Sequence, residues 1–238
     1  MTRRGFTLIE CLIGLALSLL AITAGLEFWG LSERTFRRLK AREEAGQATL
    51  AALDKIRIDL LHAGLGLFAE TGLGLVTPVE VADGELRTAA LERTLGLAAD
   101  ARAGDTRLSL VSTSGISAGR RVALRCGAAG EVRTITRIEA EALLLDGPLE
   151  RAYPADSATV SLLELVACFR DGATRVLRRR VNASPAQPLL EDTAGVAWEL
   201  VAAAPLVRIR LESAAEGVHA YETTVFLKNP ALAGGSGT

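Results

Sequence analysis

The sequence is poor in the residues from which most active sites are built. Of its 238 residues, two are histidines, three are cysteines, and only 4% are aromatic. No CxxC pair and no Cys/His cluster occurs, which argues against a zinc site. The GxSxG, HExxH and P-loop patterns of common hydrolases and nucleotide-binding proteins are also missing. We therefore predict that the chain is not an enzyme and has no catalytic, cofactor-binding or metal-binding residues.

An excess of charge of one sign is missing as well. Lysine and arginine number 27 against 28 aspartates and glutamates, which leaves a formal net charge of −1. Proteins bind nucleic acid through a basic field, so nucleic acid is not expected as a partner. The chain is long enough for one or two compact domains with a sizeable core.

What the sequence does contain is a long apolar run near its N-terminus. No residue from Cys11 to Leu26 is charged, and Arg3 and Arg4 precede the run. Glu10 lies at its edge, where a carboxylate costs on the order of a few kcal/mol if the run enters a membrane. Two ordinary explanations are a secretory signal peptide and a simple membrane anchor whose cytoplasmic end carries the arginines.

A third explanation comes from the order and spacing of the stretch Arg3-Arg4-Gly5-Phe6-Thr7-Leu8-Ile9-Glu10. This stretch resembles, position by position, the class III signal of type IV pilins and type II secretion pseudopilins. The resemblance implies a prepilin leader at residues 1–5, cleavage between Gly5 and Phe6, and N-methylation of Phe6. It also implies that Glu10 serves assembly. Its carboxylate would face the Phe6 amine of a neighbouring subunit, and each charge would then compensate the other.

The same resemblance implies a function. The chain would be a minor pilin or pseudopilin, a structural subunit at or near the tip of a type IV pilus or a type II secretion pseudopilus. Its partners would be the prepilin peptidase, the inner membrane and other pilins, contacted through the apolar helix. It would cross the bacterial inner membrane once, with its C-terminal domain in the periplasm, before it enters the filament. The alternative function is a membrane-anchored β-rich binding module of the cell envelope, which would keep residues 1–5.

Apolar periodicity predicts that the N-terminal helix continues beyond the membrane. Leucine and isoleucine recur at helical spacing between Leu50 and Leu60, which gives one apolar stripe. We expect a helix from about Phe6 to about His62, with a bend near Gly25 or Gly30. Residues 6–31 would form the membrane or filament core, and residues 32–66 an amphipathic continuation that packs on a sheet.

Two local features of this continuation have their own interpretations. The basic cluster between Arg34 and Arg42 is interpreted as a solvated face paired with nearby acids, the alternatives being contact with lipid headgroups or DNA. Gly64 is expected to end the helix in a C-cap role. The residues from Asp59 to Gly64 resemble the D-L-x-x-A-G helix end of PilW-like minor pilins.

The remaining chain, residues 67–238, is predicted to be β-rich, because short alternating runs are separated by turn residues. We therefore expect an α+β fold in which a pilin-like long N-terminal helix packs on an antiparallel β-sheet. The strands predicted from Leu162 onwards are assigned to that sheet. Residues from about 104 to 164 are expected to be an inserted small β-rich subdomain. The strand order is similar to that of PilW-like minor pilins and J-type pseudopilins.

The cysteines leave two alternatives open. Cys11 lies in the apolar run, whereas Cys126 and Cys168 lie in the β-rich part. If that part is outside the cytoplasm, Cys126 and Cys168 could form one disulfide. The other alternative is two buried free thiols, because sequence spacing does not report distance.

Four further features receive structural interpretations. The arginine run at residues 178–180 is interpreted as an exposed strand edge that discourages unwanted pairing. His62 is placed at a helix end and His219 in a turn before a strand. Trp29 is interpreted as a membrane-interface residue and Trp198 as a core residue.

Overall fold

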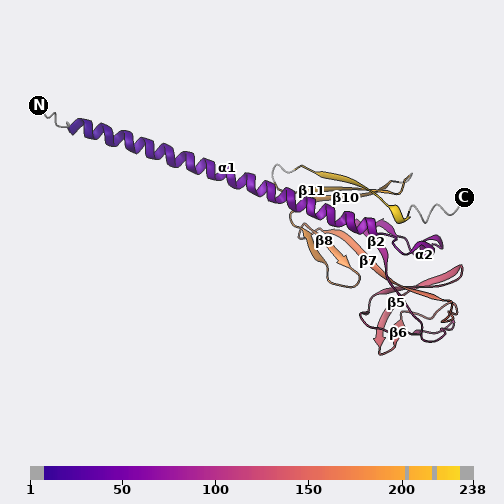
Figure 1. Cartoon of the computed structure of the whole chain (residues 1–238). Coiled ribbons are helices and arrows are strands. Elements are labelled where there is room, and N and C mark those ends of the chain that lie inside the picture. The colour runs from indigo at the N-terminus through magenta and orange to yellow at the C-terminus, as the bar shows by residue number, and fades with distance from the viewer. Residues whose placement is uncertain (1–7, 202–203, 216–218, 231–238) are drawn as a thin grey trace, which may run out of the picture.

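The computed structural model describes residues 8–201, 204–215 and 219–230 and has an α+β architecture (Figure 1). Helix α1 runs from Leu8 to His62, which confirms the predicted long helix and its end. Figure 1 shows α1 as one straight, unbroken rod, so the bend expected near Gly25 or Gly30 is not seen. Only the C-terminal part of the rod reaches the remainder of the protein.

The end of α1 is fixed by contacts with distant parts of the chain. Gly64 has a φ of +74°, a left-handed conformation that glycine adopts without strain and that confirms its capping role. Its amide donates to the carbonyl of Ala89 at 2.7 Å. The side-chain amide of Asn229 donates to the carbonyls of Leu61 and Ala63, both at 3.1 Å. The last carbonyls of the helix are therefore satisfied by a residue close to the C-terminal end of the described chain.

Within the described residues, a short helix α2 (Phe68–Gly72) and twelve strands follow α1. The strands are β1 (Val79–Ala82), β2 (Glu85–Leu95), β3 (Arg107–Ser109), β4 (Arg121–Cys126), β5 (Ala129–Glu139), β6 (Ala142–Leu145), β7 (Thr159–Asp171), β8 (Val176–Val181), β9 (Gln187–Leu190), β10 (Thr193–Val201), β11 (Leu206–Ser213) and β12 (Tyr221–Phe226). Sequence alternation predicted most of these elements. It did not identify β1, β2 or β9.

The strands form two antiparallel sheets. In the described chain, one sheet has nine strands in the order β1-β2-β7-β4-β5-β6-β3, with β8 pairing with β7 and β9 with β8. The other sheet has the order β10-β11-β12. The late strands were expected to share one sheet, and this expectation was wrong: β7 and β8 belong to the large sheet and β10–β12 to the small one.

The C-terminal part of α1 lies between these two sheets, as Figure 1 shows. Ile56 and Leu60 are completely buried in a core that includes Cys168 of β7, Leu177 of β8 and Ile209 of β11. Each sheet thus covers one side of the apolar stripe on α1. Burial of this stripe on both sides supplies the main apolar contact that holds the helix to the domain.

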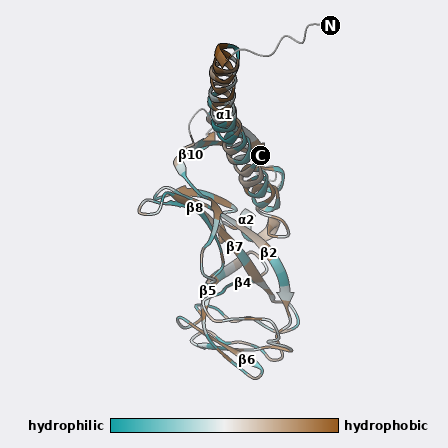
Figure 2. Ribbon diagram, turned by 90° about the vertical axis from the view of Figure 1, so that its left-hand side faces the viewer, coloured by the Kyte–Doolittle hydropathy of each residue, from teal (hydrophilic) through white to brown (hydrophobic). Residues whose placement is uncertain are grey.

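A second core fills the part of the molecule farthest from α1, around β4–β6 (Figure 2). Its buried members extend from Leu95 to Leu162 and include Leu108, Ile135 and the fully buried Tyr153. This region contains the expected insertion at about 104–164. The insertion as a separate unit stays a prediction, because β7 runs through residue 164 and contributes to both cores.

Candidate assembly helix and processing motif

The predicted processing residues Gly5 and Phe6 lie outside the described residues, whereas the predicted assembly residue Glu10 lies inside them. Glu10 is exposed and occupies the first turn of α1. A carboxylate in the first turn interacts favourably with the positive end of the helix dipole. Its neighbours Leu8 and Ile9 are 82% and 65% exposed, so Glu10 lies on an uncovered apolar surface.

The N-terminal part of α1 is long and apolar enough to cross a membrane, and none of that stretch is buried in the domain. Figure 2 shows mostly hydrophobic residues at the N-terminal end of the helix. From Leu8 to Leu31 the helix rises by about 35 Å, which is sufficient for a hydrocarbon core of about 30 Å. The expected core segment 6–31 therefore has the length and polarity of a span over its described residues.

The few hydroxyl groups of this segment are satisfied within the helix. Ser18 Oγ donates to the carbonyl of Gly14 at 2.8 Å, and Thr23 Oγ1 donates to that of Leu19 at 3.1 Å. Back-bonding of this kind removes the need for water at the hydroxyl. The segment is therefore compatible with an apolar environment over its full circumference, apart from Glu10 and Glu27.

Beyond residue 32 the helix changes from an apolar to a charged surface. Glu33 accepts a hydrogen bond from Arg37 at 2.7 Å, and Lys40 lies 3.8 Å from Glu44. Both pairs join residues four apart on one exposed helix face and contribute only tenths of a kcal/mol each. The predicted pairing of the basic cluster with nearby acids is thus present for these two basic residues.

A largely buried ion pair fastens the C-terminal part of α1 to the large sheet. Asp59, 7% exposed, accepts two hydrogen bonds from Arg179 of β8, at 2.6 Å from Nε and 2.9 Å from Nη2. The bond to Asp59 raises the pKa of Arg179, so the guanidinium stays charged. Lys55 adds a weaker contact with Asp59 at 3.7 Å. The pair fixes the rotation of α1 against the sheet.

This ion pair corrects the interpretation of the arginine run at residues 178–180 as an exposed edge. β8 lies between β7 and β9, and Arg179 points to α1, while Arg178 pairs with Asp171 at 3.2 Å. The sequence analysis did not predict the burial of Asp59. The resemblance of the helix end to D-L-x-x-A-G was the one available signal that this acid has a defined place.

The structure separates Cys126 from Cys168, and both are free thiols. Near Cys126, Arg125 of β4 pairs with Thr159 of β7, whereas Cys168 lies farther along β7 and pairs with Leu86. At about 3.3 Å per residue, the two cysteines are far beyond the reach of a disulfide. Burial, and then the charge of Asp59, raise the pKa of Cys168 to about 12. Both cysteines are thus free, as in the second alternative, but only Cys168 is buried, whereas Cys126 is partly exposed.

The remaining candidates lie apart from one another. His62 ends α1, and His219 is an exposed residue shortly before β12. Trp29 is 73% exposed on the apolar helix, whereas Trp198 is only partly buried and donates to the carbonyl of Gly84 at 3.1 Å. Among the described residues, no group of three or more His, Cys, Asp or Glu side chains is arranged to hold a metal ion.

Comparison with protein families finds a known motif at the N-terminus. The family model "Prokaryotic N-terminal methylation motif" matches residues 1–26. The match supports a type IV pilin-like class III signal, which implies processing by a prepilin peptidase and assembly with other pilins. Together with the apolar helix it is consistent with membrane anchoring. No curated protein matches the chain significantly.

Two solved structures show a limited likeness. The tailspike protein gp49 from Pseudomonas phage LKA1 is 17% identical over 31% of this chain and 14% of its own, with a TM-score of 0.28. The Gp54 tailspike of Acinetobacter baumannii bacteriophage AP22, solved with a capsular saccharide, is 13% identical over 33% and 15%, with the same TM-score. The match spans about a seventh of each tailspike, too little to define a shared fold.

Proposed function

We propose that the chain is a minor pilin or pseudopilin, a structural subunit of a type IV pilus or of a type II secretion pseudopilus. A prepilin peptidase would cleave it between Gly5 and Phe6, and Phe6 would then be N-methylated. The methylation motif over residues 1–26 supports this proposal. The resemblance of the whole chain to PilW-type minor pilins or J-type pseudopilins is a finer part of the same proposal.

The observation that carries the proposal is that the N-terminal part of α1 is apolar but unburied, whereas its C-terminal part is packed in the domain. Its described residues before Gly46 include no buried side chain, although most of those before Ser32 are apolar. Such a surface is stable only if lipid or other helices cover it. A subunit that rests in the inner membrane and then enters a filament meets both environments in turn. The same helix is held in its domain by the core around Ile56 and Leu60.

In this proposal Glu10 sets the axial register of the subunit. Cleavage after Gly5 creates a positive amine on Phe6, and Glu10 of one subunit would face that amine on its neighbour. Each charge is costly alone in an apolar assembly, and the pair compensates both. Apolar contacts would supply most of the adhesion, while the ion pair would select one stagger between helices.

A minor position near the filament tip is favoured by the size of the β-rich part. The second core extends the molecule away from α1, as Figure 2 shows, and such bulk hinders tight repetitive packing. The C-terminal domain would lie in the periplasm, because Arg3 and Arg4 favour a cytoplasmic N-terminus.

The test is intact-mass and N-terminal peptide analysis of the protein from membranes of cells that make it. We expect a mature chain that begins at Phe6 with one added methyl group. A chain that still begins at Met1 or Thr2 would instead favour the membrane-anchored β-rich binding module. Cleavage near Gly25 would indicate an ordinary signal peptide and a secreted protein.

The role of Glu10 is tested in the same cells with Glu10→Val and with Glu27→Val as a matched control on the same helix. We expect Glu10→Val to be cleaved but lost from sheared filaments, while Glu27→Val is retained in them. Equal retention of the two variants would remove Glu10 from the assembly mechanism and leave the processing assignment intact.

A further inference from the structure

Two different strands pair with the same edge of β7, β4 along its first half and β8 along its second half, and the gap between them is called the fork. β4 pairs with β7 only as far as Leu162, and β8 pairs with it only from Val166 onwards. Between these points a side chain replaces the missing strand, because Arg120 Nη2 donates to the carbonyl of Leu163 at 3.0 Å. On the other side of the fork, Asn182 Oδ1 accepts a hydrogen bond from the amide of Leu165 at 2.8 Å. These side chains satisfy backbone hydrogen-bonding groups of β7 at the point where β4 and β8 diverge.

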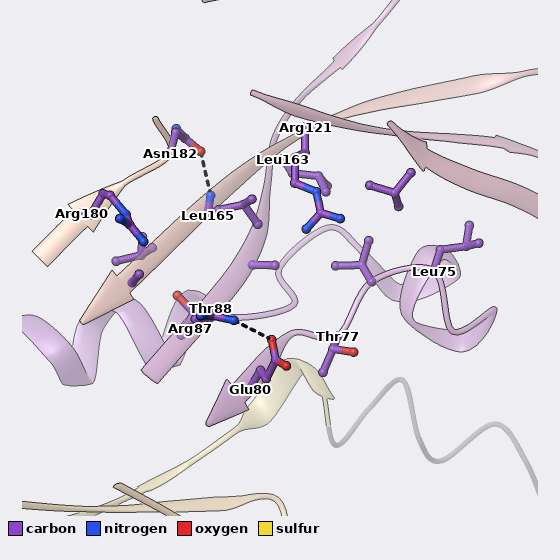
Figure 3. A pocket seen from close by; sticks show the side chains of 15 residues that line it. Leu75, Thr77, Glu80, Arg87, Thr88, Arg121, Leu163, Leu165, Arg180 and Asn182 are labelled. Carbon is purple, nitrogen blue, oxygen red and sulfur yellow. Dashed lines mark hydrogen bonds and ion pairs between the residues drawn. The ribbon is translucent and has the colours of Figure 1, made fainter. Parts of the chain in front are cut away.

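A pocket of about 340 Å³ lies at this fork (Figure 3). Leu163 and Leu165 line it from β7, and Leu75 lines it from the segment before β1. Leu163 and Leu165 lie on the face of β7 opposite Val166 and Cys168, which pack in the core around α1. The volume is in the range of small-molecule sites, which combine an apolar lining with a few polar groups.

Three arginines from three different strands add charge to this apolar lining. Arg87 of β2 is held by Glu85 at 2.9 Å and Glu80 at 3.8 Å. Arg180 of β8 has a weaker contact with Glu85 at 3.9 Å and lies over the Phe169 ring.

The third arginine, Arg121 at the start of β4, differs from the other two. Arg121 is exposed, and none of the other described residues forms an ion pair or hydrogen bond with its guanidinium. Figure 3 shows this guanidinium reaching from its strand into the pocket, close to Leu163. The pocket therefore has a mixed lining, in which leucine side chains stand beside polar groups that include Glu80 and Asn182. Glu80 pairs with Arg87, so Arg121 is the cationic group of the lining that no carboxylate of the described residues holds in an ion pair.

We propose that this pocket binds a carboxylate attached to a branched aliphatic group, with Arg121 as the anchor for its charge. A guanidinium matches a carboxylate through two parallel hydrogen bonds. One uncompensated arginine suits a single negative charge better than a doubly charged phosphate. The aliphatic part would contact Leu75, Leu163 and Leu165. A free branched-chain acid and a peptide that ends in leucine present this same chemistry.

The experiment uses the full chain in lipid nanodiscs with labelled leucine methyl groups, observed by NMR at pH 7.5. Addition of 4-methylpentanoate should shift the signals of Leu75, Leu163 and Leu165 in a saturable manner. Arg121→Gln should weaken binding by at least about tenfold. The matched control is Arg137→Gln on β5, an exposed arginine without a partner among the described residues, which should bind like the unchanged protein.

Further ligands complete the test. N-acetyl-alanyl-leucine is titrated beside the free acid, and tighter binding of one or the other identifies the source of the carboxylate. The neutral 4-methylpentanamide should bind at least about tenfold more weakly than the acid. Equal binding of amide and acid, equal loss in Arg121→Gln and Arg137→Gln, or no saturable shift with either acid would overturn the proposal. Unchanged signals of Leu53 and Leu60 show that a variant is folded.

Discussion

The two parts of α1 carry apolar residues into different surroundings. From Leu8 to Glu44 no described side chain of the helix is buried, whereas seven of its residues between Gly46 and Leu60 are. The first part is apolar all round near its start, and the second has one stripe flanked by charged residues. One continuous helix therefore has a part that its own domain stabilises and a part whose apolar surface needs a cover from outside the domain.

The largest expected effect comes from core truncation in the packed part. Ile56→Ala should lower the free energy of unfolding by about 2–5 kcal/mol, because Ile56 is completely buried between the two sheets. Leu19→Ala, at a 60% exposed position, should leave that free energy within about 0.5 kcal/mol. The measurement is urea unfolding of the full chain in detergent micelles, followed by Trp198 fluorescence in a Trp29→Phe background. Similar losses in both variants would contradict the division of α1 into two parts.

A second contrast concerns two arginine–carboxylate pairs that involve α1, one within the helix and one between the helix and β8. Arg179→Gln leaves Asp59 buried without its main partner and should cost about 3 kcal/mol. Arg37→Gln breaks the exposed pair with Glu33 and should cost less than about 0.5 kcal/mol. Both are measured by the same unfolding experiment. An equal cost would mean that the Asp59–Arg179 pair is no more buried than a surface pair.

Thiol labelling tests whether the packed part of α1 covers the residues beneath it, and its expected effect is smaller than the losses of stability above. Cys168 lies beneath α1 and its pKa is raised to about 12, so at pH 8 its thiol is both covered and protonated. In the folded protein, maleimide should label Cys126, which is partly exposed, and leave Cys168 unlabelled. Ile56→Ala should speed the labelling of Cys168. Two protected thiols that are released only by a reductant would instead indicate a disulfide.

The raised pKa of Cys168 also predicts how the free energy of unfolding depends on pH. Because the unfolded thiol ionises near its ordinary pKa of about 8.5 while the folded thiol stays protonated, stability should be constant below that pH. It should then fall as the pH rises toward 12. Urea unfolding between pH 7 and pH 10 measures the slope, and Cys168→Ala should reduce it. An unchanged slope in Cys168→Ala would assign the dependence to other groups.

The smallest expected effect compares two glycines of α1. A Cβ at Gly25 would meet nothing within 4 Å, whereas a Cβ at Gly46 would lie 3.0 Å from the Tyr221 hydroxyl. Gly25→Ala should therefore realise the full helix gain of about 0.5–1 kcal/mol, seen as slower amide exchange around residue 25. Gly46→Ala should change domain stability by less, since the contact with Tyr221 offsets the gain. A full gain at Gly46 would show that Tyr221 moves aside freely.

Local patterns determined much of this molecule before any contact was known. The apolar run and the periodicity around Ile56 predicted a helix that ends near His62, and α1 ends at that residue. Helical periodicity is a property of neighbours along the chain, so it can be read directly from the sequence. The processing motif is equally local, because a peptidase recognises consecutive residues. The match of the methylation model to residues 1–26 supports that assignment.

Partnerships between distant residues were decided only by the tertiary structure. Alternation identified β7 and β11 as strands, but it did not reveal that they lie in different sheets on opposite sides of α1. Asp59 and Arg179 are 120 residues apart, and each appeared from its neighbours to be an ordinary surface charge. Alternation specifies which face of a strand is apolar but not which strand lies beside it, because pairing depends on the contacts of the whole fold. For the same reason, no local pattern predicted that Arg121 would line a pocket at the fork of β7.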